Sequence, residues 1–161
     1  MTTEGGLHVP FALMGPEKYV PKKSVRNDLV DMLDLSATTL AWAGIKKPSW
    51  YEGQNLFAKD MEERAFVGGH KDRLDHTIDR VRTIRTDKFR YVRNYKLDRI
   101  VLQPQYRDKM NYTQNLHELY QSGGLSEIHQ EIYFGERQPE ELYDVSADPE
   151  MMINLANHPS Y

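Results

Sequence analysis

The stretch from residue 68 to residue 82 holds the densest group of side chains that could carry chemistry. In order it reads Gly68-Gly69-His70-Lys71-Asp72-Arg73-Leu74-Asp75-His76, and Asp79, Arg80 and Arg82 follow. Arginine offers a flat fork of N–H donors to sulfate or carboxylate, and histidine gives or takes a proton near neutral pH. The stretch therefore suits recognition of an anion or a sugar hydroxyl. Two other interpretations stay open, a solvated loop or a metal site built from His70, Asp72, Asp75 and His76.

The rest of the sequence does not supply a complete catalytic constellation. It contains no Gly-x-Ser-x-Gly or Ser-x-x-Lys nucleophile motif, no His-Glu-x-x-His motif, and no Walker or dinucleotide-binding glycine loop. The pairs Gly68-Gly69 and Gly123-Gly124 are typical of turns. Because cysteine is absent, a disulfide framework, a thiolate metal site and a cysteine nucleophile are excluded within this chain.

Charge is segregated along the chain. Residues 64–109 hold 13 Lys/Arg and 6 Asp/Glu, net +7, whereas residues 110–161 hold 1 and 9, net −8. Residues 1–63 hold 7 and 9, net −2, which completes the total of −3. The basic block could attract an anionic ligand, or the acidic segment could pack against it; the two interpretations are compatible.

Arginines and aromatic residues interleave in the basic block, as they do on nucleic-acid-binding surfaces. The residues are Arg82, Arg85, Phe89, Arg90, Tyr91, Arg93 and Tyr95. An isoelectric point of about 6.1 and the acidic segment argue against this class of partner, so we predict no nucleic acid. No apolar run is long enough to span a membrane or to form a signal-peptide core, so we predict no membrane partner.

The elements that must position these side chains follow from periodicity and turn residues. In chain order we expect a strand over 7–14, a helical stretch over 29–35, a second helix over 37–43 capped by Ser36 and Gly44, a strand over 64–67, a hairpin of 81–85 and 89–95, helices over 111–121 and 126–133, and an extended tail over 140–161. Alternation in the hairpin predicts an antiparallel sheet with one covered face, and the helix over 111–121 is the expected cover.

Four motifs, in one order along nearly the whole chain, resemble the sulfatase family of the alkaline phosphatase-like superfamily. They are Glu4-Gly5-Gly6-Leu7-His8-Val9-Pro10-Phe11; the helix and loop over 29–40, 43–45 and 53–56; the hairpin over 82–94; and the closing signature over 141–144, 148–150 and 154–156. Within the family, residues 70–82 are most similar to the heparan N-sulfatase (sulfamidase) type and related bacterial sulfatases.

The resemblance implies a fold in two parts. Residues 1–60 would be the terminal strand and helix of the family's α/β core, and residues 61–161 the C-terminal subdomain, an α+β unit with a small antiparallel sheet, helices and a wrapping tail. The exposed edge of the first part predicts a homo-oligomer or a complementary chain. Sulfatases are commonly periplasmic, secreted or lysosomal, and the compartment of this chain stays unknown.

The resemblance also implies which chemistry lies elsewhere. Sulfatases use a formylglycine, made from Cys or Ser in a Cys/Ser-x-Pro-x-Arg motif, together with a calcium ion. No such motif occurs here, so we expect the nucleophile, the metal site and the catalytic lysine in an N-terminal part outside this sequence, and no catalytic or metal residue within it.

The substrate-binding residues implied by the resemblance are His70, Arg73, His76 and, with less support, Asp75, on the rim of the pocket. His8 stands where the family often has arginine and would lie near the active-site floor. The expected function is the C-terminal portion of a sulfatase, a hydrolase of sulfuric esters or sulfamates of a sulfated saccharide, inactive alone. The alternative is a free-standing, non-catalytic module that binds an anionic or sulfated ligand or completes a partner chain.

Overall fold

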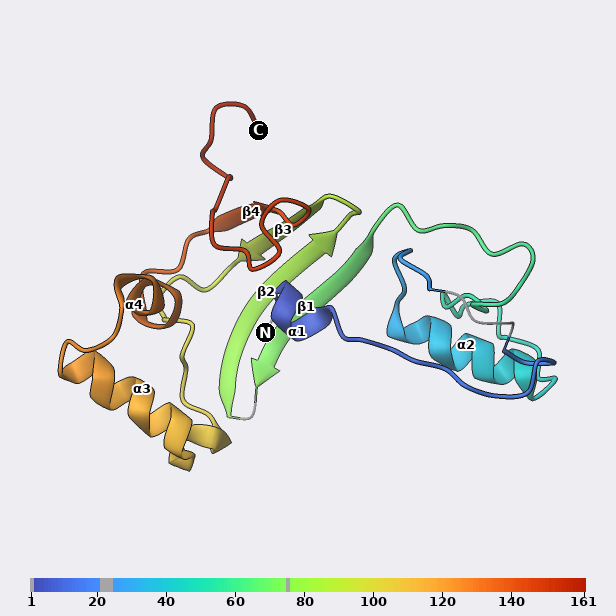
Figure 1. The fold of residues 1–161 in the computed structure, drawn as a ribbon, viewed down its shortest axis with the longest axis horizontal. Helices are drawn as coiled ribbons and strands as arrows, with labels where there is room; N and C mark the ends of the chain where they lie inside the picture. The colour runs from blue at the N-terminus through green and yellow to red at the C-terminus, as the bar shows by residue number, and fades with distance from the viewer. Residues whose placement is uncertain (1, 21–24, 75) are drawn as a thin grey trace.

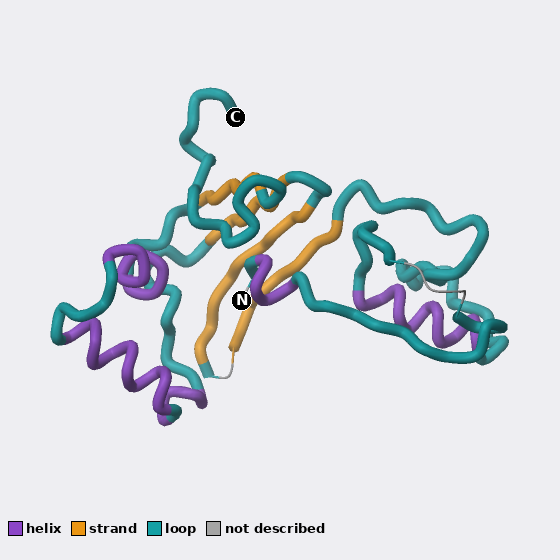
Figure 2. Tube along the Cα trace, in the orientation of Figure 1, coloured by secondary structure: helices purple, strands orange, loops and turns teal. Residues whose placement is uncertain are grey.

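The computed structural model describes residues 2–20, 25–74 and 76–161 and shows a small α+β unit around a four-stranded antiparallel sheet (Figure 1). The strands are β1 (Val67–Leu74), β2 (Thr77–Arg85), β3 (Phe89–Asn94) and β4 (Glu140–Asp144), in the order β1-β2-β3-β4. The helices are α1 (Glu4–Leu7), α2 (Met32–Trp42), α3 (Asn111–Gln121) and α4 (Glu127–Phe134), with a 3-10 turn, η1, at Tyr106–Lys109. Figure 2 shows long loops between them, above all after α1 and between α2 and β1.

The sheet has two chemically different faces because side chains alternate along each strand. On β2, Asp79, Val81 and Thr83 are buried, whereas Arg80 and Ile84 are exposed. We call the buried side the inner face and the other side the open face. α1 lies across the inner face (Figure 1), and the loop over 99–105 closes the other end of that face through Gln103, which bonds to Asp79.

The hairpin is confirmed, and β2 begins four residues before the predicted start. The predicted strand over 64–67 is wrong in its position, since β1 begins at Val67 and runs through Gly68 and Gly69. Neither glycine forms the predicted turn, and Gly69 is there for packing. A Cβ on Gly69 would stand 2.9 Å from the Leu7 Cδ1 and 2.9 Å from the Thr83 Cγ2, so glycine lets α1 approach the sheet closely.

The predicted strand over 7–14 is also wrong. α1 ends at Leu7, and residues 8–16 run as a loop that pairs with no strand of the described chain. Several of its apolar side chains face solvent, including Val9, 71% exposed, and Phe11, 57% exposed. Apolar composition alone cannot make a strand without a neighbour to accept its ladder hydrogen bonds.

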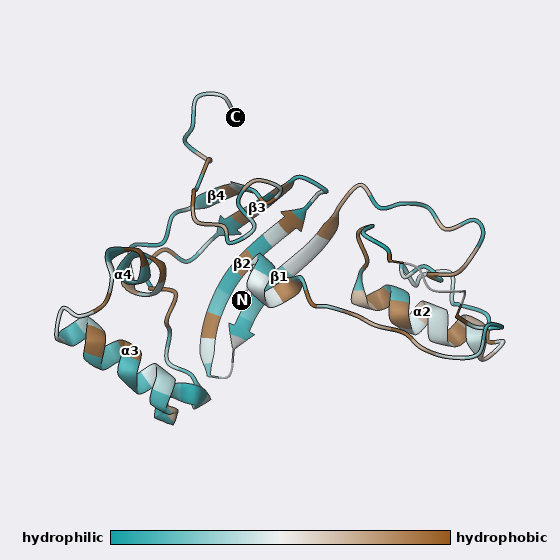
Figure 3. Ribbon diagram, in the orientation of Figure 1, coloured by the Kyte–Doolittle hydropathy of each residue, from teal (hydrophilic) through white to brown (hydrophobic). Residues whose placement is uncertain are grey.

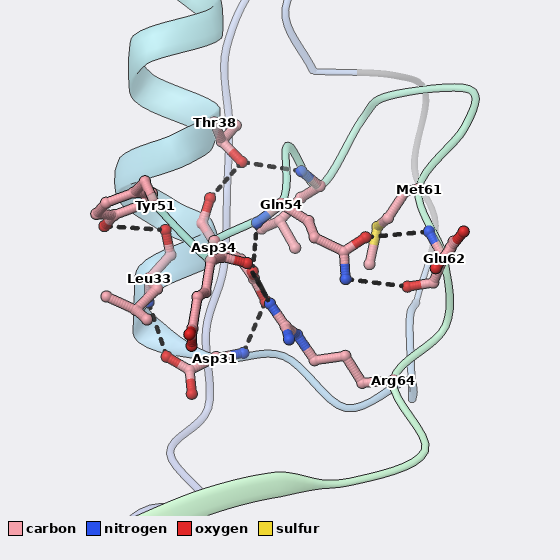
Figure 4. A network of polar contacts seen from close by, with 12 residues as sticks. Asp31, Leu33, Asp34, Thr38, Tyr51, Gln54, Met61, Glu62 and Arg64 are labelled. Carbon is pink, nitrogen blue, oxygen red and sulfur yellow. Dashed lines mark hydrogen bonds and ion pairs between the residues drawn. The ribbon is translucent and has the colours of Figure 1, made fainter. Parts of the chain in front are cut away.

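Residues 32–42 form one helix where a helical stretch and a second helix were predicted, because Asp31 rather than Ser36 caps it. The Asp31 side chain accepts from the Leu33 N–H, and the Asp34 side chain accepts from the Asp31 N–H, which forms a capping box. Gly44 ends the helix in the left-handed region with φ +69°, as predicted. Figure 4 shows Arg64 and Gln54 converging on Asp34, which ties the following loop to the helix.

The helices over 111–121 and 126–133 are confirmed in position, α4 being shifted by one residue. The predicted role of the first as the cover of the sheet is wrong, since α3 packs against η1 and lies apart from the sheet (Figure 1). Figure 3 shows that α3 is largely hydrophilic, which suits its exposed place. The tail expected over 140–161 opens with β4, which pairs with β3.

The interior of the domain is polar as much as apolar. Among the residues that the structure describes, buried apolar side chains are few, namely Ala37, Leu56, Val81, Val92, Leu125 and Val145. The largest fully buried side chains are those of Thr38, Thr113, Asp34 and Asp79. Ion pairs and hydrogen bonds therefore hold the segments together. Within the described residues, no helix is long and apolar enough to cross a membrane.

Candidate functional site

Two adjoining shallow hollows lie on the open face of the sheet. One is lined by Arg82, Thr83, Ile84, Tyr91, Arg93 and Tyr95. The other is lined by Gly68, Gly69, His70, Asp72, Arg82, Thr83 and Ile84. Arg82 borders both hollows, so a ligand along β1 and β2 would meet its guanidinium group.

Arg82 and His70 are directly opposite each other on β2 and β1. The Arg82 guanidinium donates to both oxygens of Asp72, Nη1 to Oδ1 at 2.8 Å and Nη2 to Oδ2 at 3.1 Å. These hydrogen bonds hold the pKa of Asp72 below its usual value. The hollow beside β1 therefore contains a forked cation, its carboxylate partner and an imidazole.

The hollow beside β3 combines Arg82 and Arg93 with the rings of Tyr91 and Tyr95. The Arg80 guanidinium lies over the Tyr95 ring, 4.8 Å from its centroid, and that of Arg93 lies 5.8 Å from the same centroid. Arg93 also pairs with Glu140 of β4, and Lys88 pairs with Asp144 at 3.4 Å. The acidic segment therefore packs against the basic block, which was one of the two interpretations of the charge pattern.

The structure distributes the predicted substrate-binding residues along one hairpin. His70 lies on the open face, Arg73 pairs with Ile78 beyond an irregularity in the β1–β2 register, and His76 lies in the turn; all three are exposed. Of these three, His70 is the one that lines a hollow described above. Asp75 lies outside the described residues.

His8 is on the other side of the sheet. It follows α1 on the inner face, and its Nδ1 lies 3.1 Å from Glu4 Oε2. The structure therefore does not bring His8 and His70 to one face, although both flank the edge strand β1: Leu7 contacts Gly69, the residue before His70.

The interleaved arginines divide between the two faces. Arg82 and Arg93 belong to the open face, whereas Arg85 and Arg90 turn inward to Glu4. The sequence prediction treated them as one surface and missed Glu4. The period-two alternation of the hairpin was the signal that could have separated them.

Asp79 is a second inner-face carboxylate that sequence reasoning did not single out from its cluster. It is fully buried and accepts from Lys71 Nζ at 2.8 Å, Gln103 Nε2 at 2.9 Å and Arg137 Nη1 at 2.7 Å. Burial alone would raise its pKa, but the hydrogen bonds from Arg137, Lys71 and Gln103 outweigh burial and hold the pKa far below its usual value. Its role is to join β1, β2 and the two loops.

Comparison with known proteins identifies the family. The model of the N-sulphoglucosamine sulphohydrolase C-terminal family matches residues 1–134. The chain belongs to this sulfatase family. The resemblance read from its four motifs is thereby confirmed.

Two curated relatives are ulvan-active sulfatases of Formosa agariphila (strain DSM 15362 / KCTC 12365 / LMG 23005 / KMM 3901 / M-2Alg 35-1). One is 30% identical over 160 residues, covering 98% of this chain and 27% of the relative. The other is 30% identical over 163 residues, covering 97% of this chain and 30% of the relative. This sulfatase C-terminal region thus spans less than a third of the length of these relatives.

A solved structure similar to this chain is that of a protein in complex with its substrate D-glucosamine-2-N,6-O-disulfate. The two are 20% identical, the TM-score is 0.46, and the match covers 80% of this chain and 20% of the solved one.

The calcium ion that the family implies does not fit the residues described here. Among them, no three His, Cys, Asp or Glu side chains gather in a group that could hold a metal ion. The buried carboxylates Asp34 and Asp79 are already engaged by Arg64 and Arg137, and Asp72 is engaged by Arg82. The sequence has no Cys/Ser-x-Pro-x-Arg motif that could supply a formylglycine.

Proposed function

We propose that this sulfatase C-terminal region forms part of the rim of a pocket for a sulfated saccharide, in an enzyme that hydrolyses sulfuric esters or sulfamates. The observation that carries the proposal is the His70–Arg82 pair, which faces the same hollow from two neighbouring strands. The relatives support the substrate class, since two are ulvan-active sulfatases.

Arg82 can exchange Asp72 for another anion. The Arg82 and Asp72 side chains are 41% and 55% exposed, and ion pairs at such positions contribute little to stability. A sulfate group presents oxygens to the same guanidinium fork, so it can replace the carboxylate at small cost. The imidazole of His70 can then donate to a second sulfate oxygen or to a sugar hydroxyl.

The role assigned to this region is recognition. Attack on sulfur is carried out by residues of the enzyme outside this sequence, and the rim fixes the position of the saccharide for that step. Within this proposal, residues 1–60 belong to the α/β core and residues 61–161 form the C-terminal subdomain. The position of α2 beside the sheet rather than on it supports this division (Figure 1).

Calorimetric titration of the chain with D-glucosamine-2-N,6-O-disulfate tests the rim. We expect Arg82→Gln and Arg73→Ala each to weaken binding about tenfold, the effect of losing one charge-assisted hydrogen bond. Asp72→Asn should strengthen binding because it releases Arg82. Arg107→Gln, at an exposed arginine of η1, is the matched control and should leave the affinity unchanged. Equal affinities for all four variants and the wild type would contradict the proposal.

A second surface of the chain indicates contact with a partner. The loop over residues 8–16 exposes Val9, Phe11 and Met14, the last at 99%. Exposed apolar side chains in a row are typical of a contact surface. We propose that this loop meets a complementary chain, the remainder of the sulfatase, or a second copy.

A further inference from the structure

A chain of polar contacts joins the sheet to the imidazole of His8. Glu4 Oε1 accepts from Arg85 Nε at 3.0 Å, from Arg90 Nε at 2.7 Å and from Arg90 Nη2 at 2.5 Å. The other oxygen of the same carboxylate, Oε2, lies 3.1 Å from His8 Nδ1. One carboxylate therefore links two strands to one imidazole.

Exposure changes sharply along this chain of contacts. The side chains of Arg90 and Glu4 are 4% and 10% exposed, whereas that of His8 is 76% exposed. A hydrogen bond from Arg90 Nη1 to Thr83 Oγ1 at 3.2 Å fixes the guanidinium further. The sheet therefore holds Arg90 and Glu4 in place, while the His8 imidazole faces solvent.

The carboxylate favours one position of the proton on the His8 ring. Glu4 Oε2 can only accept, so its contact with Nδ1 at 3.1 Å favours the tautomer with the proton on Nδ1, in which Nε2 is left as an acceptor. Burial alone would raise the pKa of Glu4, but Arg90 and Arg85 outweigh burial and lower it, so the carboxylate stays charged at neutral pH. Carboxylates orient histidines in this way around many reactive centres.

We propose that His8 is a substrate-contacting residue whose Nε2 accepts a hydrogen bond from a saccharide hydroxyl, and that Glu4, Arg85 and Arg90 are its positioning residues. The inference rests on the proposed function and adds a contact from the inner face to the contacts proposed on the open face. His70 approaches the β1 edge from the open face and His8 from the inner face. Contact with both imidazoles requires a saccharide that reaches around that edge.

The tautomer of His8 tests the positioning. In ¹⁵N spectra of the imidazole side chains, we expect His8 in the wild-type chain to carry its proton mainly on Nδ1. Glu4→Gln and Arg90→Gln should shift the Nδ1–H to Nε2–H ratio by about threefold or more, the effect of losing one partly exposed charge-assisted contact. Arg93→Gln, on the same strand but facing the open side, is the matched control and should leave the ratio unchanged.

Glu4→Asp is a further variant in case the others fail to fold, since it keeps the charge and shortens the reach to Nδ1. The positioning would be overturned if the wild-type His8 carried its proton mainly on Nε2, or if Glu4→Asp left the Nδ1–H to Nε2–H ratio unchanged.

Titration with D-glucosamine-2-N,6-O-disulfate separates this inference from the proposed function. A ligand-dependent shift of both His70 and His8, with the His8 shift lost in Glu4→Asp, supports the inference. A shift of His70 with none at His8 would overturn the inference and leave the proposed function standing. No shift at either imidazole would contradict both.

Discussion

Buried carboxylates, each held by arginine or lysine, are the residues on which this domain depends most. Glu4 joins α1 to β2 and β3, Asp34 joins α2 to the loop that follows it, and Asp79 joins β1 and β2 to two loops. Removing one partner from a buried pair leaves a charge without compensation, which costs far more than the intact pair contributes. Single substitutions at these residues should therefore loosen whole segments.

Asp79→Asn is the sharpest case. We expect it to lower the free energy of unfolding by about 3 kcal/mol, because Lys71 and Arg137 would remain buried beside a neutral group. Urea denaturation at pH 7 measures this, with Asp87→Asn in the exposed β2–β3 turn as the matched control.

The pKa of Asp79 is lowered in the folded chain, so its contribution to stability is present above the unfolded-state pKa near 4 and is lost as the pH falls through the folded value. Acidification should accordingly destabilise the wild type more than the variant. Equal stability of variant and wild type at pH 7 would contradict the role given to Asp79.

At the scale of elements, α2 depends on how closely the following loop approaches its first turn. A Cβ on Gly53 would stand 2.3 Å from the Leu33 carbonyl oxygen, a backbone atom that has no room to move. Gly53→Ala should cost about 2 kcal/mol or more in thermal or urea unfolding, through displacement of the loop from the helix. Gly68→Ala is the control: its Cβ would meet the Thr83 carbonyl oxygen at 4.0 Å, an ordinary contact, and should change stability by about 0.5 kcal/mol or less. A Gly53→Ala chain as stable as Gly68→Ala would refute this packing.

The sequence predicted correctly those helices and strands whose formation depends on local sequence patterns. The β2–β3 hairpin, α3 and α4 follow from alternation, helical spacing and the glycines that end them. β4 could not be predicted because its partner β3 lies about fifty residues earlier, and α1 could not because Arg85 and Arg90 hold it in place. For the site, residue types indicated anion recognition at His70 and Arg82, whereas the division of the arginines between two faces required the register of the sheet.

At the scale of the whole molecule, the loop over residues 8–16 predicts association. Its exposed apolar side chains would be covered in a dimer or by a complementary chain. Analytical ultracentrifugation at micromolar concentration should show a species larger than 18.8 kDa. The double variant Val9→Ser, Phe11→Ser should shift it toward the monomer. A stable wild-type monomer would contradict a second copy of the chain as the partner.

The central claim is that this sulfatase C-terminal region recognises a sulfated saccharide along the β1 edge of its sheet. The most direct measurement is a map of ¹H–¹⁵N chemical-shift changes when D-glucosamine-2-N,6-O-disulfate is added to the chain, with unsulfated D-glucosamine as the reference. We predict that the changes specific to the sulfated sugar cluster around His70, Arg73 and Arg82, extend to His8, and weaken with added salt because the contact is ionic. Changes confined to α3 and α4, or identical changes with both sugars, would contradict the claim.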